Sequence, residues 1–283
     1  MTAAEREFEL PGVRLAAREW GAAGAPPILA LHGWLDNAGT FDLLAPRLGG
    51  CHMIALDCAG HGLSGDRSPD SAYNIWQDVG DVAAVADELG WEGFTLLGHS
   101  RGAAIAALYA GTFPARVRAL TLIEGGVPVL GRAEDAPEIL ARALTETALL
   151  RAKTGRVFPT RDIAIAERAD GFSKTSLAAA EILARRSLIP VPEGYRWRAD
   201  QRLKATSEVR LTAGQVAAFF ARIAAPVTVF LADASPFTHE TWFLELFESV
   251  ADLTLERLPG GHHLHLEGAE ARIAAAVRHS LGI

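Results

Sequence analysis

The sequence predicts an α/β fold, in which a mostly parallel central sheet is flanked by helices. Short apolar runs typical of buried strands recur along the chain, segments with helical spacing lie between them, and glycine or proline marks many of the junctions. Repeated β-α-β units of this kind place helices on both faces of a parallel sheet. At 283 residues the chain is long enough for one large domain or two small ones.

Composition and charge exclude several classes of protein. A net charge of −7 gives no basic surface for nucleic acid or an anionic membrane, so neither is expected as a partner. The uncharged stretch 102–115 is too short to span a bilayer, and the N-terminal segment does not have the apolar run of a secretory signal. Two cysteines, Cys51 and Cys58, form no disulfide framework. We therefore expect a cytoplasmic, reduced protein.

The first 124 residues alternate between strands and helices. A hairpin over 7–18 turns at Pro11-Gly12, and Gly90 and Pro114 end the two helices. The elements expected next are strands at Pro27–Leu31 and Met53–Asp57, a helix at Asn74–Leu89, a strand at Phe94–Leu97, a helix at Gly102–Thr112 and a strand at Ala119–Ile123.

The strand pattern then disappears from Gly125 to about Ile223. This segment is rich in Ala, Arg and Glu, with helical runs at Glu138–Arg151 and Ser176–Arg186. Strands resume after Pro226, and the chain ends in an amphipathic helix; these elements are Val227–Leu231, Leu253–Leu258 and Gly268–His279. We predict a helical cap at 125–225, inserted after the sixth strand of a core formed by 1–124 and 226–283.

The strongest local pattern is G-x-S-x-G between a strand and a helix. Residues 94–102 read FTLLGHSRG, which places Ser100 at a sharp turn at the carboxyl end of the sheet. Glycine is required at 98 and 102 because a Cβ there would clash with the neighbouring strand and helix. The N-terminus of the following helix also favours negative charge beside Ser100. Ser100 is therefore the predicted nucleophile.

A histidine after the last strand can act as its base. His262 follows a Gly-Gly turn and lies at the same sheet edge as Ser100, so we prefer it to His263 and His265, which we expect to face the last helix. Clustered histidines can also form a metal site, but no nearby cysteine or acidic cluster supports one. No metal is expected.

Two positions compete for the acid that orients His262. The loop after Val227–Leu231 holds Asp233, while Ser235 stands where an acid would be expected. Glu124 directly follows the strand Ala119–Ile123, which neighbours the strand before Ser100. We favour Glu124, with Asp233 as the alternative acid.

Backbone amides after two strands can form an oxyanion hole. The candidates are the amides of Arg101, just after the nucleophile, and Trp34. His32 and the loop from Asp57 to Ser64 are interpreted as structural. The Arg101 side chain either biases the site toward anionic groups or points away along its helix.

These motifs resemble the α/β-hydrolase superfamily: HGW at 32–34, DCAGHGLS at 57–64, GHSRG at 98–102 and PGGHHLHLE at 259–267. HGWLDNAGTFD at 32–42, the long insertion and YRWRADQRL at 195–203 are similar to the serine hydrolase-like proteins, and that resemblance implies an acid at the position of Glu124. Haloalkane dehalogenases and epoxide hydrolases use an aspartate nucleophile, so their chemistry is not implied by Ser100. Ser235 departs from the pattern of many esterases.

The sequence therefore predicts a serine hydrolase that cleaves a small to medium, largely apolar carboxylic ester, thioester or lactone through an acyl-enzyme, without a cofactor. The alternatives are a lyase or cofactor-free oxygenase that uses the same Ser/His pair, or a non-catalytic ligand-binding protein. A monomer and a homodimer fit equally. The cap aromatic residues expected to line an apolar pocket are Phe158, Phe172, Tyr195, Trp197, Phe219 and Phe220.

Overall fold

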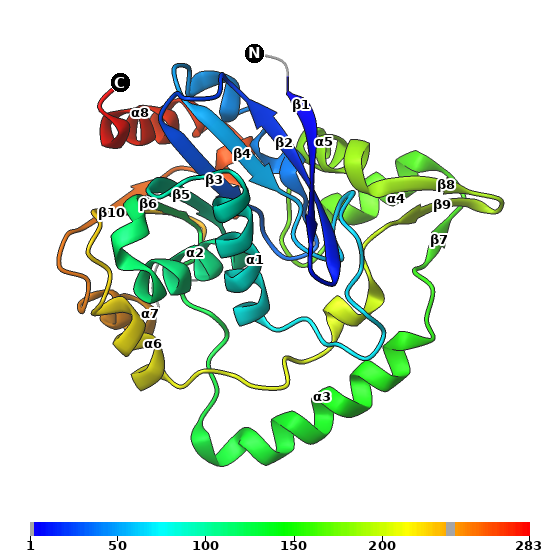
Figure 1. Ribbon diagram of the computed structural model, residues 1–283. Coiled ribbons are helices and arrows are strands. Elements are labelled where there is room, and N and C mark those ends of the chain that lie inside the picture. Colours follow the sequence, from blue (N-terminus) through cyan, green and yellow to red (C-terminus); the bar gives the residue numbers. More distant parts are fainter. Residues whose placement is uncertain (1–2, 236–240) are drawn as a thin grey trace.

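The computed structural model describes residues 3–235 and 241–283, and its centre is an eight-stranded sheet (Figure 1). The strand order is β1-β2-β4-β3-β5-β6-β10-β11. Pairing is antiparallel from β1 to β4 and parallel from β4 to β11, which confirms the predicted α/β class. The strands are β1 (Ala4–Leu10), β2 (Val13–Trp20), β3 (Pro27–Leu31), β4 (His52–Leu56), β5 (Phe94–His99), β6 (Val117–Ile123), β10 (Val227–Ala232) and β11 (Leu253–Leu258).

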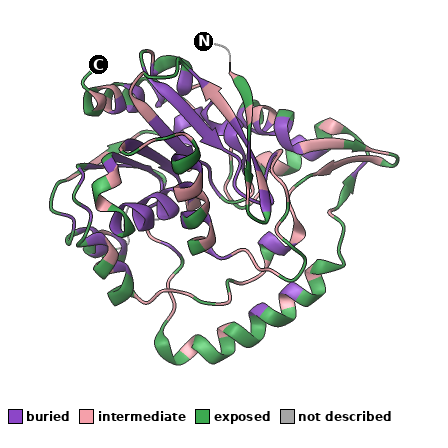
Figure 2. Ribbon diagram, viewed as in Figure 1, coloured by how far each residue is buried: buried purple, intermediate pink, exposed green. Residues whose placement is uncertain are grey.

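Alternate side chains of the central strands belong to two separate apolar cores. In β3, Leu29 and Leu31 pack on one face with α1 (Ile75–Glu88) and α2 (Arg101–Thr112), whereas Ile28 and Ala30 pack on the other face with α8 (Glu270–Leu281). Burial on both faces explains why these strands read as continuous apolar runs, and Figure 2 shows the sheet as the buried centre of the molecule.

The segment between β6 and β10 contains more than helices. Its helices are α3 (Ala136–Arg151), α4 (Arg161–Ala169), α5 (Leu177–Ser187) and α6 (Ala213–Phe220), but β7 (Val157–Phe158), β8 (Leu188–Val191) and β9 (Gly194–Trp197) also form an antiparallel sheet. These strands have two to four residues, too few for a readable alternation of side chains. The expectation that strands are missing from this segment was wrong.

The last helix of the predicted cap range packs on the core. Val216 and Phe220 of α6 are fully buried in the main apolar cluster, beside α2 and α7 (Thr241–Phe247). In contrast, α3 stands apart from the sheet and is largely exposed (Figures 1 and 2). The predicted cap range 125–225 therefore contains both α3, which lies away from the sheet, and α6, which belongs to the core.

Both cysteines are unpaired and buried. Burial raises the pKa of the Cys58 thiol, and also that of Cys51. Within the described ranges, no helix has both the length and the apolar character needed to cross a membrane.

Candidate active site

Ser100 lies at a strained turn between β5 and α2. Its φ of 52° is in the left-handed region, and its N–H donates to the carbonyl of Ile123 at 2.8 Å. A Cβ at Gly102 would lie 2.2 Å from the carbonyl oxygen of Leu31, and one at Gly98 would lie 2.5 Å from the Cα of Ala103. These contacts are the clashes expected from the sequence, and they explain why the turn needs both glycines.

Glu124 directly follows β6 and is completely buried. Its N–H donates to the carbonyl of Phe230 at 2.8 Å, and its Oε1 accepts the N–H of Ala232 at 2.6 Å. The next residue is Gly125, where a Cβ would lie 2.4 Å from the carbonyl oxygen of Ser100. The carboxylate is therefore fixed between the ends of β6 and β10, beside the Ser100 turn.

The structure brings Glu124 and His262 together. Nδ1 of His262 lies 3.2 Å from Oε2 of Glu124, and the imidazole side chain is 20% exposed. A carboxylate only accepts, so Nδ1 carries the proton and Nε2 is left as the basic nitrogen. Asp233, the alternative acid, is exposed, and its N–H pairs with the carbonyl of Leu258.

The two candidates for the oxyanion hole follow neighbouring strands, since β3 pairs with β5. Arg101 begins α2, and Trp34 lies in the turn after β3, where Leu35 has a φ of 61°. The Trp34 indole donates to the carbonyl of Leu203 at 2.9 Å, which connects this turn to the segment before α6. The Arg101 guanidinium pairs with Asp78 of α1, so its charge is already compensated there.

His32 and Asp57 hold the backbone behind this site. His32 donates from Nδ1 to the carbonyl of Gly33 at 2.7 Å and accepts the N–H of Cys58 at Nε2, at 2.9 Å. Burial lowers the pKa of His32, which agrees with a neutral ring that both donates and accepts. Asp57 accepts the N–H groups of Ala38 and Leu63 and, at 2.7 Å, the Nε–H of Arg186 from α5.

His263 and His265 do not face the last helix, contrary to the expectation from the sequence. Nε2 of His265 lies 2.7 Å from Oγ1 of Thr40, and Nε2 of His263 lies 3.0 Å from Oδ2 of Asp36. Both partners follow β3, and a short turn at 264–266 directs the two rings toward them. The sequence analysis did not single out Asp36. The only signal that could have pointed to it is its place in the HGWLDN motif at 32–37.

Asp36 also closes a buried cluster with His99. Ligating atoms of Asp36, His99 and His263 lie within 4.8 Å of one another, the spacing of a small metal site. The other oxygen of Asp36 is paired with the guanidinium of Arg168, so the protein supplies a cation to this carboxylate itself.

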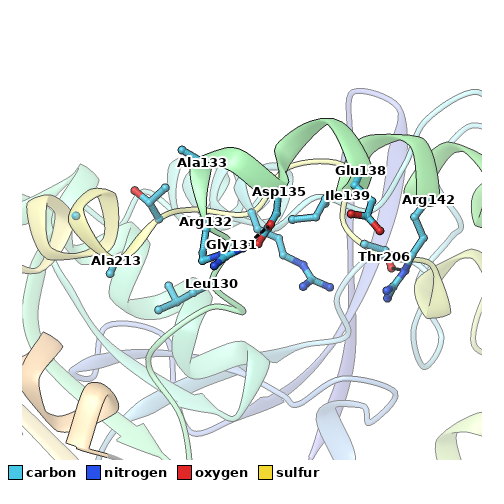
Figure 3. Close-up of a pocket in the computed structure, with 13 residues that line it drawn as sticks. Leu130, Gly131, Arg132, Ala133, Asp135, Glu138, Ile139, Arg142, Thr206 and Ala213 are labelled. Atoms are coloured by element: carbon cyan, nitrogen blue, oxygen red, sulfur yellow. Dashed lines mark hydrogen bonds and ion pairs between the residues drawn. The ribbon is translucent and has the colours of Figure 1, made fainter.

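A cavity of about 710 Å³ lies between α3 and the segment 206–214 (Figure 3). Its wall is mixed rather than apolar, with Arg132, Arg142 and Arg210 beside Asp135 and Glu138. Neither the candidate site residues nor the expected aromatic residues line it. Of those aromatic residues, Phe172 is fully exposed and Phe220 belongs to the main core.

The fold and the serine turn together define an α/β hydrolase, and the sequence resembles the serine hydrolase-like proteins. A family model described as alpha/beta hydrolase fold matches residues 26–269, and the chain belongs to that family.

Several proteins with similar sequences are named as serine hydrolases or serine hydrolase-like proteins. The chain is 29% identical over 276 residues to a "Probable serine hydrolase" of Drosophila melanogaster, a match that covers 93% of this chain and 83% of the fly protein. It is 40% identical over 121 residues to the human "Serine hydrolase-like protein", covering 42% of this chain. The matched segments span 60% of that human protein and 38% of the human "Serine hydrolase-like protein 2".

Solved structures share the whole architecture. A hypothetical protein from Pseudomonas aeruginosa PAO1 is 41% identical, with a TM-score of 0.94 and 99% of both chains covered. A thioesterase domain from the curacin biosynthetic pathway is 24% identical, with a TM-score of 0.86 over 100% of both chains. This similarity supports the fold and carries no conclusion about function.

Proposed function

We propose that the protein is a serine hydrolase that cleaves a small to medium, largely apolar ester, thioester or lactone through an acyl-enzyme. The observation that carries the proposal is the position of the buried Glu124 carboxylate, which pairs with His262. The next residue, Gly125, lies against the Ser100 turn, because a Cβ there would be 2.4 Å from the carbonyl oxygen of Ser100. The three residues thus share one edge of the sheet, where an activated serine needs its base and its acid.

The proposed reaction has two steps. His262 takes the Ser100 proton as the hydroxyl oxygen attacks the carbonyl carbon, and the oxyanion accepts the N–H groups of Trp34 and Arg101. The imidazolium is stabilised by Glu124 and protonates the leaving group, which leaves Ser100 acylated. A water then attacks the acyl carbon as His262 takes its proton, and the imidazolium returns that proton to the Ser100 oxygen as the ester bond breaks, which releases the acid and regenerates the serine.

Ser100→Ala tests the proposal. Turnover of p-nitrophenyl butyrate should fall by about 1000-fold or more, and labelling by a fluorophosphonate probe should disappear. Ser280→Ala is the matched control because Ser280 is an exposed helical serine, and it should behave as wild type. Circular dichroism and thermal melting establish that both variants fold. Full activity in a folded Ser100→Ala protein would refute the proposal.

A further inference from the structure

One buried carboxylate contacts the neighbours of both reacting residues. Asp36 lies two positions after Trp34, and its side chain is 2% exposed. Its Oδ2 lies 3.0 Å from Nε2 of His263 and 3.7 Å from Nδ1 of His99. His99 directly precedes Ser100 and His263 directly follows His262. Asp36 therefore connects the turn of the proposed oxyanion hole with the histidine loop through His263, and it lies beside His99 without a hydrogen bond to its ring.

His99 extends this connection to the backbone of His262. Its Nε2 lies 2.9 Å from the carbonyl oxygen of His262, and because a carbonyl only accepts, this nitrogen carries the proton. The ring also packs against the turn after β3, since a Cβ at Gly33 would lie 2.9 Å from Nδ1 of His99. The His99 ring is thus wedged between Gly33 and the backbone that carries His262.

The negative charge of Asp36 is paired with a cation from α4, in the segment between β6 and β10. The guanidinium of Arg168, on α4, pairs with Oδ1 of Asp36, and its side chain is only 15% exposed. Burial and the neighbouring histidines lower the pKa of His99 well below its usual value, so its ring is neutral and gives Asp36 no positive charge. A carboxylate that loses its cation in such a place is costly, because a buried unpaired charge is strongly destabilising.

We propose that the Arg168–Asp36 ion pair is a latch through which the cap helix α4 positions His262 for catalysis. With α4 seated, Asp36 holds the ring of His263, the residue after His262, while His99 donates from Nε2 to the carbonyl of His262. When α4 moves away, the carboxylate loses its cation and the histidine loop loses its support. Arg168, Asp36 and His99 are positioning residues, and the latch rests on the proposed function.

Arg168→Gln tests the latch. The substitution removes the charge and keeps most of the side-chain volume, so substrate binding changes little while His262 becomes less well placed. We expect kcat for p-nitrophenyl butyrate to fall by roughly 10-fold or more, with KM within about twofold, because small misplacements of a catalytic group cost this much. The rate of fluorophosphonate labelling should fall in parallel.

Arg156→Gln is the matched control. Arg156 pairs with Glu167, the residue of α4 just before Arg168, but this pair is exposed. Its loss should leave kcat and KM unchanged. Arg168→Lys should recover part of the lost kcat, and millimolar guanidinium should recover part of it in Arg168→Gly. A loss of kcat equal in Arg156→Gln, or a rise in KM alone in Arg168→Gln, would overturn the latch.

A double-mutant cycle tests whether Asp36 and Arg168 support His262 through the same contact. Asp36→Asn and Arg168→Gln should be strongly non-additive in kcat, because either change breaks the same pair; additive losses would contradict the latch. A stoichiometric metal in the purified protein that Asp36→Asn removes would also overturn it. If the wild-type protein neither cleaves the ester nor reacts with the probe, the proposed function itself fails. An active wild type with an unaltered Arg168→Gln variant refutes the latch alone.

Discussion

Glu124 and His262 lie 138 positions apart in the chain, yet Oε2 of the first is 3.2 Å from Nδ1 of the second. The other oxygen of the same carboxylate accepts the N–H of Ala232 on β10. The two oxygens therefore have separate partners, one in the sheet and one in the site. This division makes the effect of an amide substitution at this position predictable.

In Glu124→Gln, the amide oxygen must face the N–H of Ala232, which turns the amide NH₂ toward His262. Nδ1 of His262 then accepts instead of donating, and Nε2 carries the proton and can no longer act as a base. We expect kcat for p-nitrophenyl butyrate to fall by about 1000- to 10,000-fold, as for other wrong-tautomer substitutions. Steady-state kinetics measure the loss.

Asp233→Asn is the control for that variant, since Asp233 is exposed. It should keep kcat within about twofold, in line with a surface substitution. If Asp233→Asn costs more activity than Glu124→Gln, the assignment of the acid is reversed.

Gly125→Ala should damage the site by contact alone. The new Cβ would lie 2.4 Å from the carbonyl oxygen of Ser100, so the serine turn must shift. We expect a loss of activity of about 100-fold, from a displacement on the order of 1 Å. The comparison is Gly80→Ala in the exposed part of α1, where nothing lies within 4 Å and helix propensity predicts a gain of about 1 kcal/mol in unfolding free energy. Equal effects of the two variants would contradict a steric cause.

Arg186→Met should destabilise the fold. The Arg186 side chain is 4% exposed and its partner Asp57 is fully buried, so removal of the guanidinium leaves a buried carboxylate without its cation. Urea unfolding should show a loss of about 3 kcal/mol, the usual cost of breaking a buried pair. Arg142→Met breaks an exposed pair with Glu146 on α3 and should cost less than about 0.5 kcal/mol. A loss below about 1 kcal/mol in Arg186→Met would mean that backbone donors alone satisfy Asp57.

Acidification should destabilise the protein through buried histidines. Burial, with His263 nearby, lowers the pKa of His265 well below 6.5 in the folded state. The unfolded chain therefore binds more protons, so the stability contribution is present above pH 6.5 and falls as the pH drops below that value. For one such group the loss between about pH 7.5 and 5.5 is about 1.4 kcal/mol.

His265→Gln isolates this contribution, because the amide can keep the contact with Thr40 and does not titrate. Urea unfolding of both proteins at the two pH values gives the difference. The variant should lose about 1.4 kcal/mol less than wild type on acidification. Identical pH dependences would show that His265 does not remain neutral in the folded protein.

Contiguous signals predicted most of the core. The nine residues 94–102 include a strand, the serine turn and the start of a helix. The β-α-β pattern also predicted that the strands before Ser100 and Glu124 are neighbours, and β5 does pair with β6. Packing between distant segments has no such local signal. The pair formed by Arg168 and Asp36 joins residues 132 positions apart and depends on how α4 seats on the core. Helical periodicity predicts which face of a helix is buried but not where the helix packs, so it could not predict that α6 joins the core while α3 lies outside it.

The two cysteines are buried and unpaired, so we expect the native protein to react slowly with thiol reagents. A thiol reacts as its thiolate, and burial raises the pKa of both Cys51 and Cys58, which disfavours that form in each. A cysteine introduced at the fully exposed Phe172 would carry a fluorophore at a single known place in the segment between β6 and β10. A second one on the exposed surface of α8 would complete a donor–acceptor pair. The distance between the segment 125–225 and the core can then be followed in single molecules while substrate is present.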